Sequence, residues 1–275
     1  MCYHRRMRRV VSGWLVLGAL AAAGGVSTAA VDPLTSARRL YNQGLFDRAL
    51  DAAREAEANA ATVASARLVI GRVHLERFRR NADSADLEAA RGALRGLDPH
   101  ALDSRERVEL VIGLAELLYF DDRFGASAEM LEPALDATSA LGPDAHERAL
   151  EWWASALDRQ AQTVPVDERA DSYGRIVDRM QRELARDAAS VPANYWLVAA
   201  ARGQGDLARA MEIVTAAWLR ASLTKDAGIG LRADLDRLVV QGILPDRAAR
   251  MPARDRRQAL ARMLNEWEAF KQKWR

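Results

Sequence analysis

The chain has 275 residues, of which 49% are apolar and 28% charged, and these fractions exclude an intrinsically disordered polypeptide. Aromatic residues make up only 6%, and alanine is abundant, which favours helices packed through small side chains over a β-sandwich. The formal net charge of +2 becomes −2 without residues 1–30, which hold four arginines and no acid. The overall charge therefore predicts neither a nucleic-acid partner nor an anionic membrane partner.

The first thirty residues have the pattern of a secretory signal peptide. A basic stretch, "HRRMRR", precedes the apolar run "VVSGWLVLGALAAAGGV", and small residues then allow cleavage after Ala29 or Ala30. An uncleaved anchor over residues 10–30 is the alternative, because this segment is long enough to cross a bilayer. We expect a bacterial periplasmic or secreted protein that meets a membrane only through this segment, if it is retained. Cys2 lies upstream of the apolar run, so the cleaved chain would contain no disulfide.

From Pro33 onward the sequence pattern is helical. Apolar residues recur at i, i+3, i+4 and i+7, with few β-branched runs. Turn signals such as "NQGLFD", "NADSAD", "FDDRF", "LGPDA" and "GQGD" divide the chain at regular intervals. This pattern predicts an all-α fold of helices joined by short loops, and its regularity suggests internal repeats.

The first helix pair is predicted within residues 37–56, "ARRLYNQGLFDRALDAAREA". Gly44 falls at the turn, where a glycine adopts a backbone conformation that other residues resist. Small and aromatic residues occupy the positions where the two helices meet: Ala37, Leu40, Tyr41, Phe46, Ala49 and Ala56. This arrangement resembles the tetratricopeptide repeat, a helix–turn–helix unit of about 34 residues.

Further units follow along the chain. Similar copies occur at residues 113–135, where Asp122 replaces the turn glycine, and at residues 195–218, where Gly205 retains it. Divergent units are predicted at residues 62–98 and 143–188. In the former, the loop around "RFRRNADSAD" is expected to be longer than the family allows, and in the latter the second helix or loop is extended. The resemblance implies a tetratricopeptide-like right-handed α-solenoid of about five helix pairs over residues 33–221.

Residues 222–275 depart from the repeat pattern and are predicted to form a C-terminal helical cap. We expect a short helix, a turn beginning at Pro245 and a long amphipathic final helix. The apolar stripe of that helix consists of Leu260, Met263, Leu264, Trp267 and Phe270. Open solenoids need terminal caps with a polar outer face. The alternative is that residues 231–250 form a docking segment for a partner.

The sequence contains no recognisable catalytic motif, and we predict no catalytic residue, metal or cofactor. His74, His100 and His146 lack the spacing of metal ligands, and no HExxH, GxSxG or phosphate-binding glycine loop occurs. Each of these histidines is interpreted as a satisfied core or surface residue.

The resemblance also implies where a partner would bind. In tetratricopeptide arrays, the first helix of each pair lines a concave groove that holds a peptide or a segment of another protein. Carried over by position, the lining consists of Arg38, Tyr41, Asn42, Arg72, Glu76, Glu109, Glu116 and Tyr119, with Phe120, Glu151 and Asp158 as further members. The face would be basic near the N-terminus and acidic further on, with tyrosines as amphipathic anchors. The acidic continuation argues against a clamp for C-terminal carboxylates.

The expected function is therefore protein–protein interaction, as a scaffold or adaptor in the cell envelope with a protein or peptide partner. The alternative is a helical-repeat enzyme or binding component acting on cell-wall glycan or a transported solute. An exposed tryptophan beside two convergent carboxylates would favour the glycan enzyme, and Trp152 is the tryptophan expected to be most exposed. An enclosed apolar cavity would favour the solute-binding component.

Overall fold

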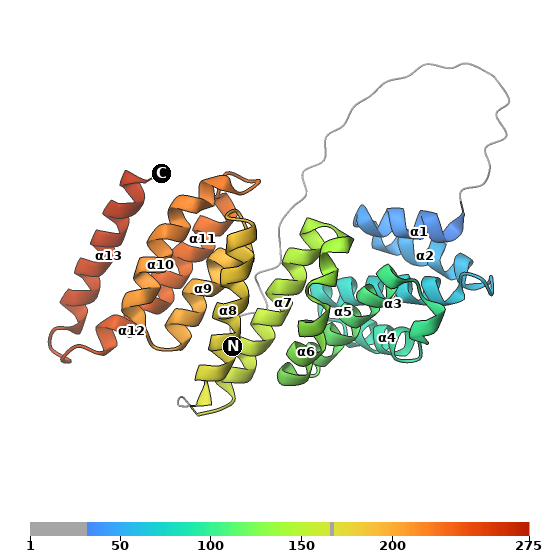
Figure 1. Ribbon diagram of the computed structural model, residues 1–275, viewed down its shortest axis with the longest axis horizontal. Coiled ribbons are helices and arrows are strands. Elements are labelled where there is room, and N and C mark those ends of the chain that lie inside the picture. Colours follow the sequence, from blue (N-terminus) through green and yellow to red (C-terminus); the bar gives the residue numbers. More distant parts are fainter. Residues whose placement is uncertain (1–31, 166–167, 275) are drawn as a thin grey trace, which may run out of the picture. The chain divides into compact units, whose positions relative to one another are not determined.

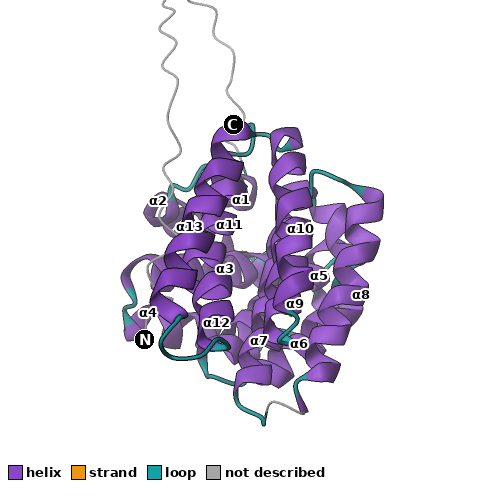
Figure 2. Ribbon diagram, turned by 90° about the vertical axis from the view of Figure 1, so that its left-hand side faces the viewer, coloured by secondary structure: helices purple, strands orange, loops and turns teal. Residues whose placement is uncertain are grey.

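The computed structural model describes residues 32–165 and 168–274, and within these ranges the chain forms helices and loops without a β-strand (Figures 1 and 2). This confirms the predicted all-α class. The predicted signal peptide, residues 1–30, lies outside the described residues. The described chain divides into two compact units, unit 1 ending at Asp122 and unit 2 beginning at Arg123. None of the helices in the described ranges has the length and apolar character needed to cross a membrane.

Unit 1 is built from successive helices that pack on their neighbours. Its described elements are α1 (Pro33–Asn42), α2 (Phe46–Glu57), α3 (Val63–Asn81), α4 (Ser84–Arg95), the short 3-10 helix η1 (Pro99–Ala101) and α5 (Ser104–Phe120). Helix α1 packs against α2 and α3, and α3 packs in turn against α4 and α5. The helices α1, α3 and α5 are thus adjacent, although long stretches of sequence separate them.

The turn between α1 and α2 depends on Gly44, which has φ +73° in the left-handed region. The Gly44 amide donates to the Tyr41 carbonyl at 2.9 Å, and the Leu45 amide donates to the Leu40 carbonyl at 3.0 Å. These bonds satisfy carbonyls at the end of α1 and turn the chain back. The alanines predicted at the helix contacts are buried, with Ala37 and Ala49 fully excluded from solvent.

Helices α3 and α4 are joined more tightly than the sequence predicts. Helix α3 continues to Asn81, and α4 begins at Ser84 after a two-residue connection. Ala82 adopts φ +54°, and the Asp83 carboxylate accepts from the Ala85 amide at 2.9 Å, which caps α4. The expectation of a long loop around "RFRRNADSAD" is wrong because its arginines remain helical; Arg77, for example, lies 3.2 Å from Asp86 across the turn.

Unit 2 contains the remaining helices. Its described elements are α6 (Phe124–Leu131), η2 (Glu132–Ala134), η3 (Ala137–Leu141), α7 (Pro143–Gln162), α8 (Ala170–Arg186), α9 (Val191–Gly203), α10 (Leu207–Arg220), η5 (Ala221–Leu223), α11 (Ile229–Leu238), the π-helical turn η6 (Val239–Ile243), α12 (Leu244–Ala249) and α13 (Arg256–Lys273). Helix α7 packs against α6, α8 and α9, and α9 packs against α8 and α10. Gly205 has φ +80° in the α9–α10 turn, as its place in the third repeat copy predicts.

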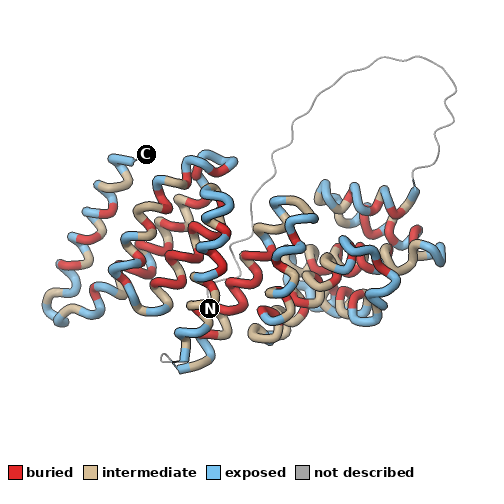
Figure 3. Tube along the Cα trace, in the orientation of Figure 1, coloured by how far each residue is buried: buried red, intermediate tan, exposed pale blue. Residues whose placement is uncertain are grey.

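The C-terminal segment shares one hydrophobic core with α9 and α10. Ala210 and Val214 of α10 belong to the same buried cluster as Leu235 of α11 and Trp267 of α13. Figure 3 shows buried positions recurring along these helices, between exposed ones. The outward side of α13 is polar, with exposed residues such as Gln258 and Asn265. The expected turn at Pro245 is wrong: the chain stays helical through η6 into α12, and Pro245 lies just after the π-helical turn, which already departs from the regular i→i−4 hydrogen bonding that a proline would interrupt.

Candidate functional site

The groove residues predicted in the N-terminal half gather on one side of unit 1. Arg38 and Tyr41 come from α1, Arg72 and Glu76 from α3, and Glu109 from α5. A hydrogen bond joins Tyr41 to Glu76, and an ion pair joins Arg72 to Glu109, so side chains from all three helices are connected. Together with Glu106, Glu116, Tyr119 and Asn42, they form what we name the α1/α3/α5 face.

Arg72 lies at the centre of this face. Its Cζ atom is 4.5 Å from the centroid of the Tyr41 ring, and its guanidinium forms an ion pair with Glu109. The Arg72 and Glu109 side chains are 24% and 16% exposed. Burial by itself would lower the pKa of this guanidinium, but the neighbouring Tyr41, Glu109 and Glu116 outweigh it and raise that pKa. Arg72 therefore carries a permanent charge that connects α1, α3 and α5.

Glu106 belongs to the face, although the sequence did not mark it as a lining residue. Its carboxylate pairs with Arg38 and also accepts from the Asp103 amide at 3.0 Å. The Glu106 amide donates to the Asp103 carboxylate at 2.8 Å, which completes a capping box at the start of α5. The D-x-x-E spacing of these two acids is the signal that could have located Glu106.

The other predicted members lie on the same three helices. The Tyr41 hydroxyl donates to Glu76 at 3.4 Å, and Arg79 donates to the same carboxylate at 3.0 Å. Asn42 is exposed at the last position of α1. The ring of Tyr119 meets the Phe120 ring edge-on, with centroids 6.1 Å apart. The face thus combines aromatic rings with guanidinium and carboxylate groups.

Glu151 and Asp158, predicted to continue the lining, lie on α7 in unit 2 and accept hydrogen bonds there. Glu151 accepts from the Trp196 indole at 2.7 Å, and Asp158 accepts from the Tyr173 hydroxyl at 3.0 Å. Burial raises the pKa of the Asp158 carboxyl, against the opposing effect of the Tyr173 hydrogen bond. These carboxylates are thus held by partners within unit 2.

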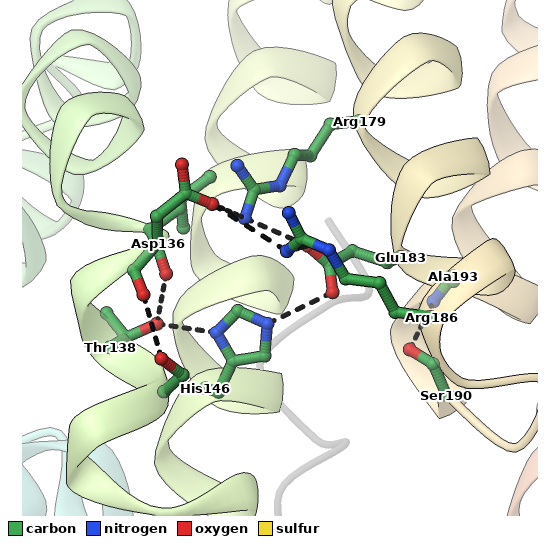
Figure 4. Close-up of polar contacts among 10 residues, drawn as sticks. Asp136, Thr138, His146, Arg179, Glu183, Arg186, Ser190 and Ala193 are labelled. Carbon is green, nitrogen blue, oxygen red and sulfur yellow. Dashed lines mark hydrogen bonds and ion pairs between the residues drawn. The ribbon is translucent and has the colours of Figure 1, made fainter.

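A hydroxyl, an imidazole and a carboxylate lie in sequence in unit 2, as Figure 4 shows. Thr138 Oγ1 is 2.7 Å from His146 Nδ1, and His146 Nε2 is 3.1 Å from Glu183 Oε2. This order is that of a nucleophile, a base and an orienting acid. However, Thr138 is 0% exposed, and its hydroxyl lies within 2.6 Å of the Leu135 carbonyl, to which it donates. A hydroxyl so enclosed bridges two segments and is inaccessible to a substrate.

Two arginines surround this group and strengthen the connection between η3 and α8 (Figure 4). Arg179 lies 2.9 Å from both Asp136 and Glu183, and Arg186 lies 3.2 Å from Glu183. The positive charge of Arg179 holds the pKa of Asp136 below its usual value. The cluster is therefore an ion-pair network that fixes local structure.

Two of the histidines considered as metal ligands or catalytic bases, His74 and His146, have neighbouring side chains as partners. His74 Nδ1 lies 2.7 Å from Asp86 Oδ1, and His146 contacts Thr138 and Glu183, as expected for satisfied histidines. Across the described ranges, no group of three or more histidine, cysteine, aspartate or glutamate side chains is placed to hold a metal ion.

The prediction that Trp152 is the most exposed tryptophan is wrong. Trp152 is only 7% exposed, because α7 has helices packed on several sides, whereas Trp274 is 43% exposed. The Trp152 indole is consequently inaccessible as a platform for a sugar.

No protein-family model matches the chain, and no curated protein matches it significantly in sequence.

Proposed function

We propose that the chain is an exported, tetratricopeptide-like adaptor that binds a protein or peptide partner on the α1/α3/α5 face. The proposal includes a right-handed solenoid of about five helix pairs, a cap formed by residues 222–275 and removal of residues 1–30 on export to a bacterial periplasm. The observation that supports it is the position of Arg72, which contacts Tyr41 and Glu109 and so connects α1, α3 and α5, the helices that the resemblance makes the first of their pairs. That is the side on which the family binds its partners.

The chemistry of the face suits a peptide segment. Tyr41 offers a ring and a hydroxyl, and rings of this kind bury apolar area at a small cost in conformational entropy. Arg72 and Glu109 hold each other in place, so the face is organised before a partner arrives, which reduces the entropy lost on binding.

In-cell photo-cross-linking tests this proposal. A photoreactive residue at Asn42 is exposed beside the network without removing an ion pair, and one at Ala85, exposed on α4, is the matched control. We expect the residue at position 42 to cross-link to one dominant envelope protein, and Arg38→Gln to reduce the yield of that adduct. The residue at position 85 should not form this adduct. Equal adducts from both positions, or no protein adduct from Asn42 in cells that export the chain, would exclude the face as the binding site.

A further inference from the structure

The connection between α12 and α13 concentrates positive charge. Residues 247–257 contain five arginines and a single acid, Asp255. All five are exposed, and we name them the arginine corner: Arg247, Arg250, Arg254, Arg256 and Arg257. The near-neutral charge of the whole chain conceals this local excess because acids elsewhere cancel it.

Most of these charges are not neutralised by carboxylates. Arg250 donates to the Gly205 carbonyl at 2.8 Å, and Arg256 donates to the Met251 carbonyl at 2.9 Å. Arg254 lies 3.6 Å from Asp255. Within the described part of the chain, Arg247 and Arg257 have no ion pair. The hydrogen bonds to carbonyls orient two of the guanidinium groups and leave their charge in place.

The corner also opposes the electrostatics of α13. Helix α13 begins at Arg256, its first turn contains no acid, and the Asp255 side chain makes no capping hydrogen bond. Cations are unfavourable at a helix N-terminus, where the helix dipole is positive. Arg256 and Arg257 therefore lie where the helix dipole disfavours cations, and an anion outside the chain would compensate both the arginines and the helix terminus.

We propose that the arginine corner docks on an anionic phospholipid surface. Guanidinium groups bind phosphate oxygens with paired hydrogen bonds, and a cluster of four to eight basic residues is typical of such docking. Residues 247–257 include no aromatic side chain on which a nucleic-acid base could stack. The corner is an exposed connection between helix ends, and a surface of headgroups requires only that several cations face outward. This inference is independent of the proposed partner on the α1/α3/α5 face.

The test measures how close the corner comes to lipid headgroups. A donor fluorophore is attached at Ala253→Cys in a full-length Cys2→Ser chain, and an acceptor is placed on the headgroups of phosphatidylglycerol–phosphatidylcholine vesicles. A donor at Ser222→Cys is the comparison: η5 follows Trp218, whose indole donates to the Trp274 carbonyl at 3.0 Å, so position 222 lies near the C-terminal end of α13, whereas the α12–α13 connection precedes its N-terminal end. We expect stronger transfer from position 253, with vesicles containing phosphatidylglycerol but not with pure phosphatidylcholine, and a decrease as salt increases.

Charge reversal separates docking from folding. Combining Arg254→Glu, Arg256→Glu and Arg257→Glu should lower the affinity for phosphatidylglycerol vesicles, measured from the transfer at increasing lipid concentration, about 100-fold. Acids in the first turn of α13 favour the helix, so the melting temperature should not fall. The matched control is Arg39→Glu, Arg48→Glu and Arg54→Glu, three exposed arginines of unit 1, which should retain docking.

Three results would overturn the proposal. One is unchanged transfer in the corner variant, and another is an equal loss in the unit 1 control. The third is a donor at position 253 that responds to polyglutamate and not to phosphatidylglycerol, which would assign the corner to an acidic protein segment.

Discussion

Arg72 of α3 lies over the aromatic ring of Tyr41 of α1, with its Cζ atom 4.5 Å from the ring centroid. The Nη1 atom of the same guanidinium forms the ion pair with Glu109 of α5. A single side chain thus makes a cation–π contact with one helix and an ion pair with another. This arrangement suggests that Arg72 stabilises unit 1 as well as shaping its face.

Replacing Arg72 with methionine should lower the free energy of unfolding of unit 1 by about 1–3 kcal/mol, because the largely buried Glu109 would keep only the more distant Arg105, at 3.5 Å, as a cationic partner. Arg72→Lys should recover only part of the loss, since an ammonium cannot both stack and pair in this geometry. Urea unfolding followed by hydrogen exchange in α1 measures this, because all the described tryptophans are in unit 2. Arg39→Met, at an exposed position of α1, is the control, and an equal effect of the two substitutions would contradict the assignment.

Ala49 offers a test of the close contact between α1 and α2. Its side chain is 0% exposed, so Ala49→Leu should destabilise unit 1 by about 1–3 kcal/mol through overpacking. Ala85→Leu places the same side chain at an exposed position of α4 and should have little effect. Circular dichroism melts of the two variants decide the question. If Ala49→Leu melts like the parent, the position tolerates added volume and the helices are not in close contact there.

The helical class and several local features followed from residue types in the sequence. Gly44 marks a left-handed turn and Ala49 a buried contact because each has a short-range physical cause, a positive φ or a lack of space. The groove residues of α1, α3 and α5 were placed by repeat spacing alone, and the structure does bring Tyr41, Arg72 and Glu109 together.

Other features depended on interactions that a local pattern does not contain. The α3–α4 turn is short, and an ion pair between Arg77 and Asp86 connects the two helices across it. Pro245 remains in a helix because η6 leads directly into α12. Glu106 became part of the candidate face because Arg38, distant in sequence, reaches the capping box of α5. Burial of Trp152 likewise results from several helices packed around α7.

Gly44 and Asp122 both have a positive φ, so removing glycine from the first position and introducing it at the second should change stability in opposite directions. Gly44→Ala should cost about 1–2 kcal/mol, because alanine resists the φ of +73° at this turn. A Cβ atom at position 44 would meet nothing closer than 3.7 Å, so the cost would be backbone strain rather than a clash. Asp122→Gly, at φ +56°, should instead be neutral or stabilising. Thermal melts of both variants measure this, and a stabilising Gly44→Ala would show that the left-handed turn is not formed.

Asp136 should make the stability of unit 2 depend on acid. Its pKa is lowered, chiefly by the charge of Arg179, so the folded carboxyl holds its proton less tightly than the unfolded one. The resulting stability is present above the unfolded pKa, about 3.9, and is lost as the pH falls through the lower folded pKa. Asp136→Asn should therefore reduce the melting temperature more at neutral pH than in acid, as followed by tryptophan fluorescence. Equal reductions at both pH values would mean that the ion pair contributes nothing.

Asp158 should show the reverse dependence. Burial raises the pKa of its carboxyl, so the folded state favours the proton, and this contribution is complete below the unfolded pKa and is lost as the pH rises through the folded value. Asp158→Asn removes the charge and keeps an oxygen that can accept from the Tyr173 hydroxyl, which lies 3.0 Å from the native carboxylate. Relative to the parent, this variant should gain stability as the pH rises from acid to neutral, whereas Asp136→Asn should lose it. Tryptophan fluorescence melts of both variants over the same pH series provide the comparison. If the melting temperatures of both variants fell relative to the parent as the pH rose, the two carboxyl groups would not have the opposite environments that the structure gives them.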